Sequence, residues 1–296
     1  MSSPSHWLVV ANPLAGKDKN RKIRDQVLQV LVEKEQSFNL IERESFFEVE
    51  DQLLASLQRE QDLRGILVVG GDGTIHHVAQ TTWRAGYDLP IAVVPQGTGN
   101  DFARQLGLYG KRVADLLEFF ISDDPVKVDV LTMDEHLALQ VISTGLDASV
   151  SHQSRKMPSF LGQSRYVLAL LKQLRSLPVI RYDLMIDGQR HQKEAILVAV
   201  ANGRNYGGGM LISPHSINDD GLFEIILVAP VGRLRLLLLF PRIFTGRHID
   251  HPLVTALKGT SVKIEADTIA EADGEPLSSG PLDHLITLTR LQFWRM

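Results

Sequence analysis

The feature that most constrains the fold is the sequence GGDGT at residues 70–74, which directly follows an apolar run at residues 66–69. An apolar run that ends in three glycines within four residues predicts a buried strand that opens into a tight turn. Apolar side chains at three- and four-residue steps then predict a helix, whose first N–H groups can bind phosphate. Because Asp72 would repel a phosphate, its presence indicates a divalent cation between the two. The alternative is an ordinary strand–turn–helix connection in which Asp72 caps the helix.

The first part of the chain alternates predicted strands with predicted helices. The strands are the apolar runs at residues 7–11, 38–41, 66–69 and 91–94. Turns rich in glycine or asparagine follow three of them, at residues 12–16, 70–74 and 95–101. This alternation predicts a mostly parallel sheet with helices on its faces. Such sheets bind ligands at the carboxyl ends of their strands, so the three turns are expected at the ligand-binding edge.

Beyond about Pro125 the chain is expected to form short strands separated by turns. Strands are predicted at residues 126–131, 137–142, 179–186, 195–201, 223–228, 261–265 and 285–291, and helices at 165–177 and 234–244. Many strands with few helices favour an antiparallel sandwich or barrel. We therefore expect an α/β domain over residues 1–125 and a β-rich antiparallel sandwich over residues 126–296, with the active site in the cleft between them.

The composition excludes several classes of protein. The 296 residues contain no cysteine, which excludes disulfides, thiolate metal sites and cysteine nucleophiles. The net charge of −4 argues against bulk binding of nucleic acid. No basic region precedes the first apolar run, and the longest apolar region is interrupted by proline, glycine and arginine. We therefore predict neither a secretory signal nor a transmembrane segment, and we expect a cytoplasmic protein.

Taken together, the three turns resemble those of the diacylglycerol kinase catalytic-domain family, bacterial lipid kinases that are related to sphingosine and ceramide kinases. The resemblance continues through the second domain and spans nearly the whole chain. Its further motifs, in order, are Gly145-Leu146-Asp147-Ala148, Asn202 with Gly207-Gly208-Gly209-Met210, Pro214, Asp219-Asp220-Gly221-Leu222 and Asp273-Gly274-Glu275-Pro276. The ordered set is far more specific than any one motif.

The resemblance implies an enzyme that transfers the γ-phosphoryl group of ATP to the hydroxyl of a lipid, with diacylglycerol as the expected acceptor and phosphatidic acid as the product. Glu275 matches the family's general base, and Asp72 and Asp101 complete the implied catalytic set. The implied nucleotide-binding residues are Asn12, Gly70, Gly71, Asp72, Gly73, Thr74, Thr98 and Asn100. The lipid would be met at the membrane surface, so a peripheral place at the inner membrane is implied as well.

Two Mg2+ sites follow from the same resemblance. Asp72, Asp101 and Asp129 match acidic positions that organise the catalytic Mg2+, partly through water. Asp220 matches a second, structural Mg2+ site that backbone oxygens of Ile217 and Leu222 complete. Ligation by oxygen alone suits a hard cation.

The sequence departs from the family pattern after Thr74, where His76-His77 replaces the usual Asn-Glu. Adjacent residues point in different directions on a helix, so these two histidines are not expected to share a metal. Surface substitution at a tolerant site is the simpler interpretation, and a contact between His76 and the nucleotide is the alternative. In the first turn, Lys17 is expected to be a solvated loop residue.

Two other functions stay open beside the lipid kinase. An NAD kinase also carries the sequence GGDGT in a similar two-domain arrangement, although residues 95–101 and 273–275 match the lipid kinases. A non-catalytic lipid- or nucleotide-binding relative is the other alternative, against which Asp72, Asp101 and Glu275 argue. The lipid head group and a homodimer are left open.

The leucine-rich stretch at residues 234–240, with Arg233, Arg242 and Arg247 nearby, has two interpretations of equal weight. The leucines belong to the core, or they contact a membrane surface whose lipid phosphates meet the arginines.

Overall fold

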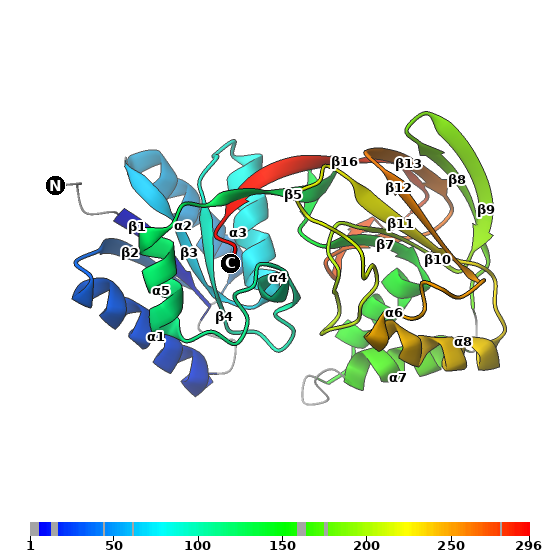
Figure 1. The fold of residues 1–296 in the computed structure, drawn as a ribbon, viewed down its shortest axis with the longest axis horizontal. Coiled ribbons are helices and arrows are strands. Elements are labelled where there is room, and N and C mark those ends of the chain that lie inside the picture. The colour runs from blue at the N-terminus through cyan, green and yellow to red at the C-terminus, as the bar shows by residue number, and fades with distance from the viewer. Residues whose placement is uncertain are drawn as a thin grey trace. The chain divides into compact units, whose positions relative to one another are not determined.

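The chain folds into two units (Figure 1). The computed structural model describes residues 6–12, 17–43, 45–60, 62–158, 164–174, 177–278 and 280–296. Met1–Val128 together with Arg290–Met296 form the first unit, and Asp129–Thr289 form the second.

The first unit contains a parallel sheet in the order β2-β1-β3-β4. Its strands are β1 (His6–Ala11), β2 (Ser37–Glu42), β3 (Leu63–Gly70) and β4 (Ile91–Pro95). Its helices are α1 (Lys17–Glu33), α2 (Phe46–Arg59), α3 (Asp72–Arg84), α4 (Asp101–Gln105) and α5 (Val113–Ser122). The three inner strands are almost entirely buried, which explains why they are continuous apolar runs in the sequence. The predicted parallel α/β fold is confirmed.

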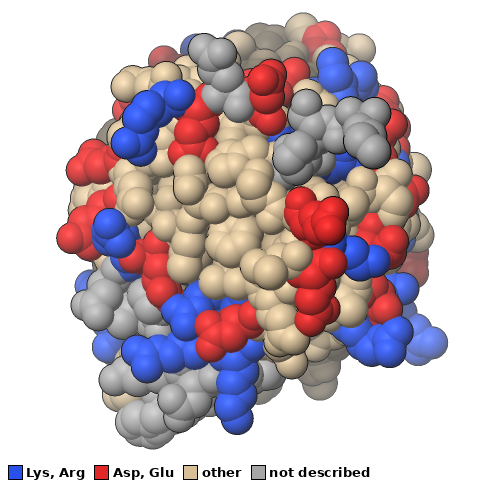
Figure 2. Space-filling model, turned by 90° about the vertical axis from the view of Figure 1, so that its left-hand side faces the viewer, with Lys and Arg blue, Asp and Glu red and all other residues tan. Residues whose placement is uncertain are grey.

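Figure 2 shows the face of the molecule at the left of Figure 1. Basic and acidic side chains alternate around an area without charged residues. Charges of both signs are interspersed on this face, so it carries no extended field of one sign.

The last seven residues return to the first unit. Phe293, at the end of β16 (Leu282–Phe293), pairs in parallel with Ile91 of β4. The next residue, Trp294, is fully buried, with its ring 5.3 Å from that of Trp7 and its Nε1 donating to the Asp123 carbonyl at 2.9 Å. The expected division at residue 125 leaves this segment in the second domain, whereas the structure assigns it to the first unit.

The second unit is an antiparallel sandwich. One sheet has the order β12-β11-β10-β7-β14-β15, and the other contains β16-β13-β8-β9 with β5 and β6. The first six strands are β7 (Val141–Gly145), β10 (Leu197–Ala201), β11 (Phe223–Val228), β12 (Val254–Gly259), β14 (Ala270–Ala272) and β15 (Glu275–Ser278). The others are β5 (Val126–Met133), β6 (His136–Ala138), β8 (Ile180–Ile186), β9 (Gln189–Ala195) and β13 (Ser261–Ala266). Side chains from both sheets form one buried cluster that includes Tyr182, Ile264, Val200 and Phe223, so the predicted sandwich is confirmed.

Three helices cover the outer face of the β7–β10–β11 sheet. They are α6 (Leu146–Arg155), α7 (Ser164–Gln173) and α8 (Arg233–Leu239), and the 3-10 helix η2 (Phe240–Thr245) continues α8. A second buried cluster joins Leu170, Leu236 and Leu239 of these helices to Ala199 and Ile226 of the sheet. No helix in the described part of the chain is both long and apolar enough to cross a bilayer.

Several predicted elements differ from the observed ones. The strand predicted at 137–142 is two strands, β6 and β7, because the N–H groups of Leu139 and Gln140 bond to the side chain of Asp273 and not to a neighbouring strand. The helix predicted at 234–244 changes from α to 3-10 geometry at Phe240, next to Pro241, whose nitrogen cannot donate a hydrogen bond. Helix α6 and strands β9, β12, β14 and β15 were not predicted.

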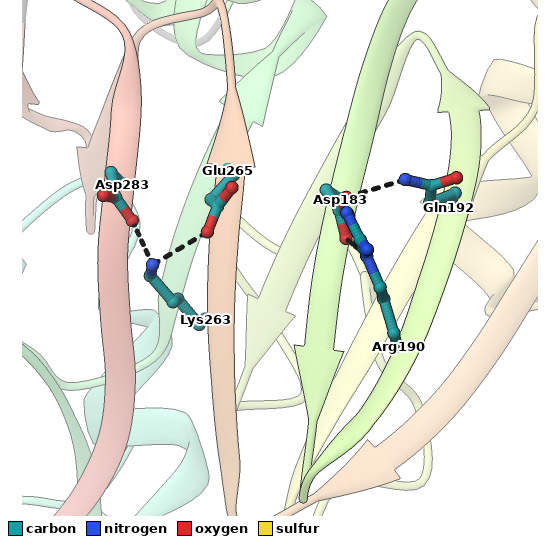
Figure 3. A network of polar contacts seen from close by, with 6 residues as sticks. All are labelled: Asp183, Arg190, Gln192, Lys263, Glu265 and Asp283. Atoms are coloured by element: carbon teal, nitrogen blue, oxygen red, sulfur yellow. Dashed lines mark hydrogen bonds and ion pairs between the residues drawn. The ribbon is translucent and has the colours of Figure 1, made fainter.

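The exposed face of the other sheet carries a polar network (Figure 3). Arg190 and Gln192 of β9 donate to Asp183 of β8 at 2.9 and 2.8 Å. The Arg190 guanidinium lowers the pKa of Asp183 to about 2. Lys263 of β13 bridges Glu265 and Asp283. These pairs keep an edge strand and its neighbours solvated.

Candidate functional site

Two glycine-rich turns touch at the carboxyl ends of β3 and β4. Gly71 precedes α3, and a Cβ on it would lie 2.8 Å from the Cα of Gly97, while a Cβ on Gly97 would lie 2.8 Å from the Cα of Gly71. The Gln96 N–H also donates to the Gly70 carbonyl at 2.8 Å. Only glycine permits this approach of one backbone to another. The turns predicted to bind phosphate are therefore brought together.

The first turn joins them through Asn12. Its Nδ2 donates to Oγ1 of Thr74 at 3.4 Å, and its backbone N–H donates to the Val69 carbonyl at 3.4 Å. Thr74 is buried in the first turn of α3, whereas Gly73 is exposed. Residues 13–16 of this first turn lie outside the described part of the chain.

Asp72 links α3 to α4. Its carboxylate oxygens accept the N–H groups of Asp101 and Phe102, each at 3.2 Å. The capping role weighed from the sequence is thus present, but the helix that Asp72 caps is α4. Asp101 itself is only 2% exposed. The two side chains offer carboxylate oxygens, the type of donor that a hard cation such as Mg2+ prefers.

The second turn is closed by Asn100. This residue has a left-handed backbone with φ of 53°, and its side chain both accepts the Gly97 N–H at 2.6 Å and donates to the Gly97 carbonyl at 2.7 Å. Thr98, between them, is exposed. A loop fixed in this way presents Thr98 and the loop backbone to solvent.

A hollow of about 700 Å³ opens beside the second turn. It lies among the end of β4, α1, α5 and the loop before α5, and its polar lining includes Gln26, Gln29, Gln96, Tyr109 and Lys111. A volume of this size is typical of small-molecule sites.

The two histidines of α3 are not surface substitutions, contrary to the simpler interpretation of the sequence. His76 is 8% exposed. His77 packs its ring against Phe46, with centroids 4.9 Å apart, and its Nε2 lies 2.9 Å from the Phe46 carbonyl. Burial lowers the pKa of His77. Sequence spacing places the pair on a helix but does not show that His77 packs against Phe46 of α2.

Asp129 lies in the second unit, at the turn that contains Asp220. Its Oδ2 accepts the Gly221 N–H at 2.7 Å, and its backbone N–H donates to the Asn218 carbonyl at 2.7 Å. Asp220 is exposed, and its Oδ1 accepts the Leu222 N–H at 3.0 Å. Asp129 is therefore a buried anchor of this turn.

The metal sites predicted from the family pattern are not formed by side chains alone. Within the described ranges, no three His, Asp or Glu side chains gather into a cluster that could hold a metal ion. At the second predicted site, Asp220 and Ile217 are both exposed on the same turn, and carboxylate and carbonyl oxygens fit a hard cation.

Glu275 is exposed at the start of β15, directly after a tight turn formed by Asp273 and Gly274 with φ of 49° and 88°. The Asp273 carboxylate accepts three backbone N–H groups, from Leu139 at 2.6 Å and from Gln140 and Val141 at 3.0 Å. Asp273 thus ties the hairpin that carries Glu275 to the β6–β7 connection. In the sequence, Asp273 stands within a motif of the family pattern, and its Asp-Gly dipeptide indicates a turn but not this role.

The second unit also encloses an apolar cavity of about 70 Å³ beneath α6, α7 and α8. Its lining includes Leu146, Leu170, Leu236 and Ile243. Three polar residues, Asp147, Tyr206 and His248, also border it. The Tyr206 hydroxyl donates to the Asp147 carboxylate at 3.0 Å, and His248 is 4% exposed. Burial lowers the pKa of His248, whose Nε2 lies 3.1 Å from the Ile212 carbonyl.

Comparison with known proteins identifies the family. Residues 6–133 match the diacylglycerol kinase catalytic domain, and residues 140–293 match the YegS C-terminal NAD kinase beta sandwich-like domain. A diacylglycerol kinase of Mycobacterium tuberculosis is 32% identical over 217 residues, which are 71% of this chain and 70% of that protein. The chain belongs to the diacylglycerol kinase catalytic-domain family. This member of the family is accordingly a lipid kinase, and the resemblance inferred from the sequence is confirmed.

Two further relatives extend the comparison. A diacylglycerol kinase of Staphylococcus carnosus is 28% identical over 262 residues, which are 87% of this chain and 84% of that protein. A crystal structure of a diacylglycerol kinase from Bacillus anthracis superposes with a TM-score of 0.73 at 19% identity and covers 100% of this chain and 98% of that one. At that identity the structural match establishes the shared fold.

Proposed function

We propose that this lipid kinase transfers the γ-phosphoryl group of ATP to the hydroxyl of diacylglycerol and so forms phosphatidic acid. The observation that carries the proposal is the contact between Gly71 and Gly97, which places two glycine-rich turns at neighbouring strand ends. Phosphoryl transfer depends mainly on positioning and charge neutralisation, and backbone N–H groups at strand ends supply both.

The nucleotide phosphates would lie on residues 70–74 and on Thr98, with Asn12 fixing Thr74 in place. When bound, Mg2+ would neutralise negative charge on the transferred phosphoryl group. Asp72 and Asp101 would hold it, because their carboxylates belong to the residues that join the two turns. We place a second, structural Mg2+ at Asp220, with the backbone oxygens of Ile217 and Leu222.

Glu275 would accept the proton of the lipid hydroxyl as its oxygen attacks the γ-phosphorus. Its exposure leaves the carboxylate accessible to a substrate, and the three hydrogen bonds of Asp273 fix the hairpin that presents it. The proposed base belongs to the second unit and the phosphate-binding turns belong to the first, so turnover requires both units.

The second unit would hold the lipid. Its cavity of about 70 Å³ is lined mainly by leucine and isoleucine, a lining that suits a short part of an acyl chain, whereas a dinucleotide acceptor such as NAD needs polar partners and a larger pocket. We therefore assign the acyl chain to this unit and the nucleotide to the first.

The test compares Glu275→Gln with the parent protein. The amide keeps the shape of the side chain but cannot accept the proton, so we expect turnover with diacylglycerol vesicles to fall by about 10²–10⁴-fold. ATP binding, measured by displacement of a fluorescent nucleotide, should stay unchanged. Glu194→Gln, at an exposed glutamate of β9, is the matched control.

Turnover of Glu275→Gln near the parent rate would show that the base is assigned wrongly. Parallel reactions with NAD in place of the lipid test the acceptor. Phosphorylation of NAD, with none of diacylglycerol, would overturn the proposed function.

A further inference from the structure

The leucines of α8 divide into two sets that face opposite ways. Leu236 and Leu239 are 7% and 6% exposed and line the apolar cavity, whereas Leu234 and Leu238 are 78% and 75% exposed. The core interpretation of this stretch therefore holds for Leu236 and Leu239, whereas Leu234 and Leu238 lie outside the core. Two leucines that are about three-quarters exposed and lie one helical turn apart bury little surface in this chain, and such a pair is typical of a surface that meets an apolar partner.

The exposed set continues onto neighbouring segments. Leu237 and Phe244 extend it along α8 and η2, and Leu168 and Leu171 of α7 are also exposed. Both α7 and α8 border the same cavity through their buried faces, so the two helices are neighbours. We call the exposed residues the apolar surface, and its members are Leu168, Leu171, Leu234, Leu237, Leu238 and Phe244.

The two segments that form this surface carry charges of one sign. The chain as a whole has a net charge of −4, yet it contains no Asp or Glu between Asp147 and Asp183, a segment with six Lys and Arg residues. It again contains none between Glu224 and Asp250, where Arg233, Arg235, Arg242 and Arg247 are all exposed. Both segments contribute a helix to the apolar surface.

We propose that the apolar surface and the arginines beside it dock this lipid kinase on an anionic bilayer. The leucines and Phe244 would enter the interface while the arginines meet lipid phosphates. A second copy of the chain fits less well, because two identical basic surfaces would repel each other. The inference rests on the proposed function, since a lipid acceptor is supplied by the bilayer, and it places the cavity directly behind the docked helices.

The experiment is cosedimentation of the purified protein with vesicles of phosphatidylglycerol and phosphatidylcholine, without ATP or diacylglycerol. We expect Leu234→Ser/Leu238→Ser to weaken vesicle binding by at least about tenfold, because two leucine side chains no longer leave water. Leu285→Ser is the matched control, since this leucine is 51% exposed on β16 of the same unit. It should bind vesicles as the parent does.

The charge component is tested separately with Arg235→Glu/Arg242→Glu. Each arginine near an anionic surface contributes roughly fivefold to affinity, so this variant should bind weakly and the parent should lose affinity as NaCl increases. Lys193→Glu, at an exposed lysine of β9, is the matched control. Vesicles of phosphatidylcholine alone should bind the parent less than the mixed vesicles do.

Thermal unfolding decides whether a variant can be interpreted. Both leucines are exposed, so the Tm should match that of the parent; if it falls, the arginine variant carries the test. Parent-like vesicle binding by both double variants, or an equal loss in both controls, would overturn the proposal. The proposal would also be overturned if the parent were a dimer, the leucine variant were a monomer, and both bound vesicles equally.

The design also separates this inference from the proposed function. Vesicle binding is measured without turnover, so loss of binding in the double variants supports the docking surface even if diacylglycerol is not phosphorylated. Conversely, a short-chain diacylglycerol in solution should be phosphorylated equally by the parent and the leucine variant, because neither leucine belongs to the proposed catalytic set.

Discussion

Asp273→Ala should strongly destabilise the second unit. The carboxylate accepts three backbone N–H groups, and all three belong to buried residues, Leu139, Gln140 and Val141. Hydrogen bonds to a charged group each contribute about 1.5–3 kcal/mol, and water can reach this half-buried position, so we expect a loss of about 3–5 kcal/mol in the free energy of unfolding. The left-handed φ of 49° adds to the cost for alanine.

Urea unfolding followed by far-UV circular dichroism measures this loss. All three tryptophans, Trp7, Trp83 and Trp294, lie in the first unit, so their fluorescence cannot replace it. Asp273→Asn keeps one acceptor oxygen and tolerates the backbone, and we expect it to lose about 1–2 kcal/mol. The control is Asp267→Ala, an exposed aspartate of the same unit, with an expected change within about 0.5 kcal/mol. A loss below about 1 kcal/mol for Asp273→Ala would refute the reasoning.

Gly71→Ala should lower the free energy of unfolding by about 1–3 kcal/mol and weaken ATP binding, because the new Cβ would press on the backbone of Gly97. Gly73→Ala is the control in urea unfolding, since open space surrounds its new Cβ and no loss is expected. Burial lowers the pKa of His248 and so favours its neutral form, which makes the folded state lose stability as the pH falls below about 6.5. His248→Gln should flatten that part of the stability–pH profile, and an unchanged profile would contradict the assignment. Asp220→Ala should remove any rise of the Tm on adding Mg2+ without nucleotide, and a parent whose melting ignores both Mg2+ and chelator would argue against this cation site.

The parallel sheet could be predicted because its inner strands are buried on both faces. Burial on two faces forces an unbroken apolar run, which the sequence displays directly at β1, β3 and β4. Strand β9 has the opposite character. Its side chains are mostly polar and exposed, and only pairing with β8 makes it a strand. Periodicity carries no signal for an element of that kind.

Only part of the candidate site could be predicted from the sequence. Glycine at positions 71 and 97 marks two turns, but their contact depends on the parallel pairing of β3 with β4. The role of Asp273 is out of reach for sequence reasoning, because its hydrogen-bond partners precede it by more than 130 residues. The burial of His76 and the partial burial of His77 likewise depend on neighbouring elements and not on their own helix.

The return of residues 290–296 to the first unit has a consequence for biosynthesis. Residues 1–128 leave the ribosome long before Trp294, which packs against Trp7. At about 5–20 residues per second, the first unit waits on the order of ten seconds or more for its last core residues. During that interval its sheet lacks a buried aromatic side chain and the strand segment that pairs with β4. Until residues 290–296 emerge, the first unit of the nascent chain therefore exposes apolar surface to which a chaperone can bind.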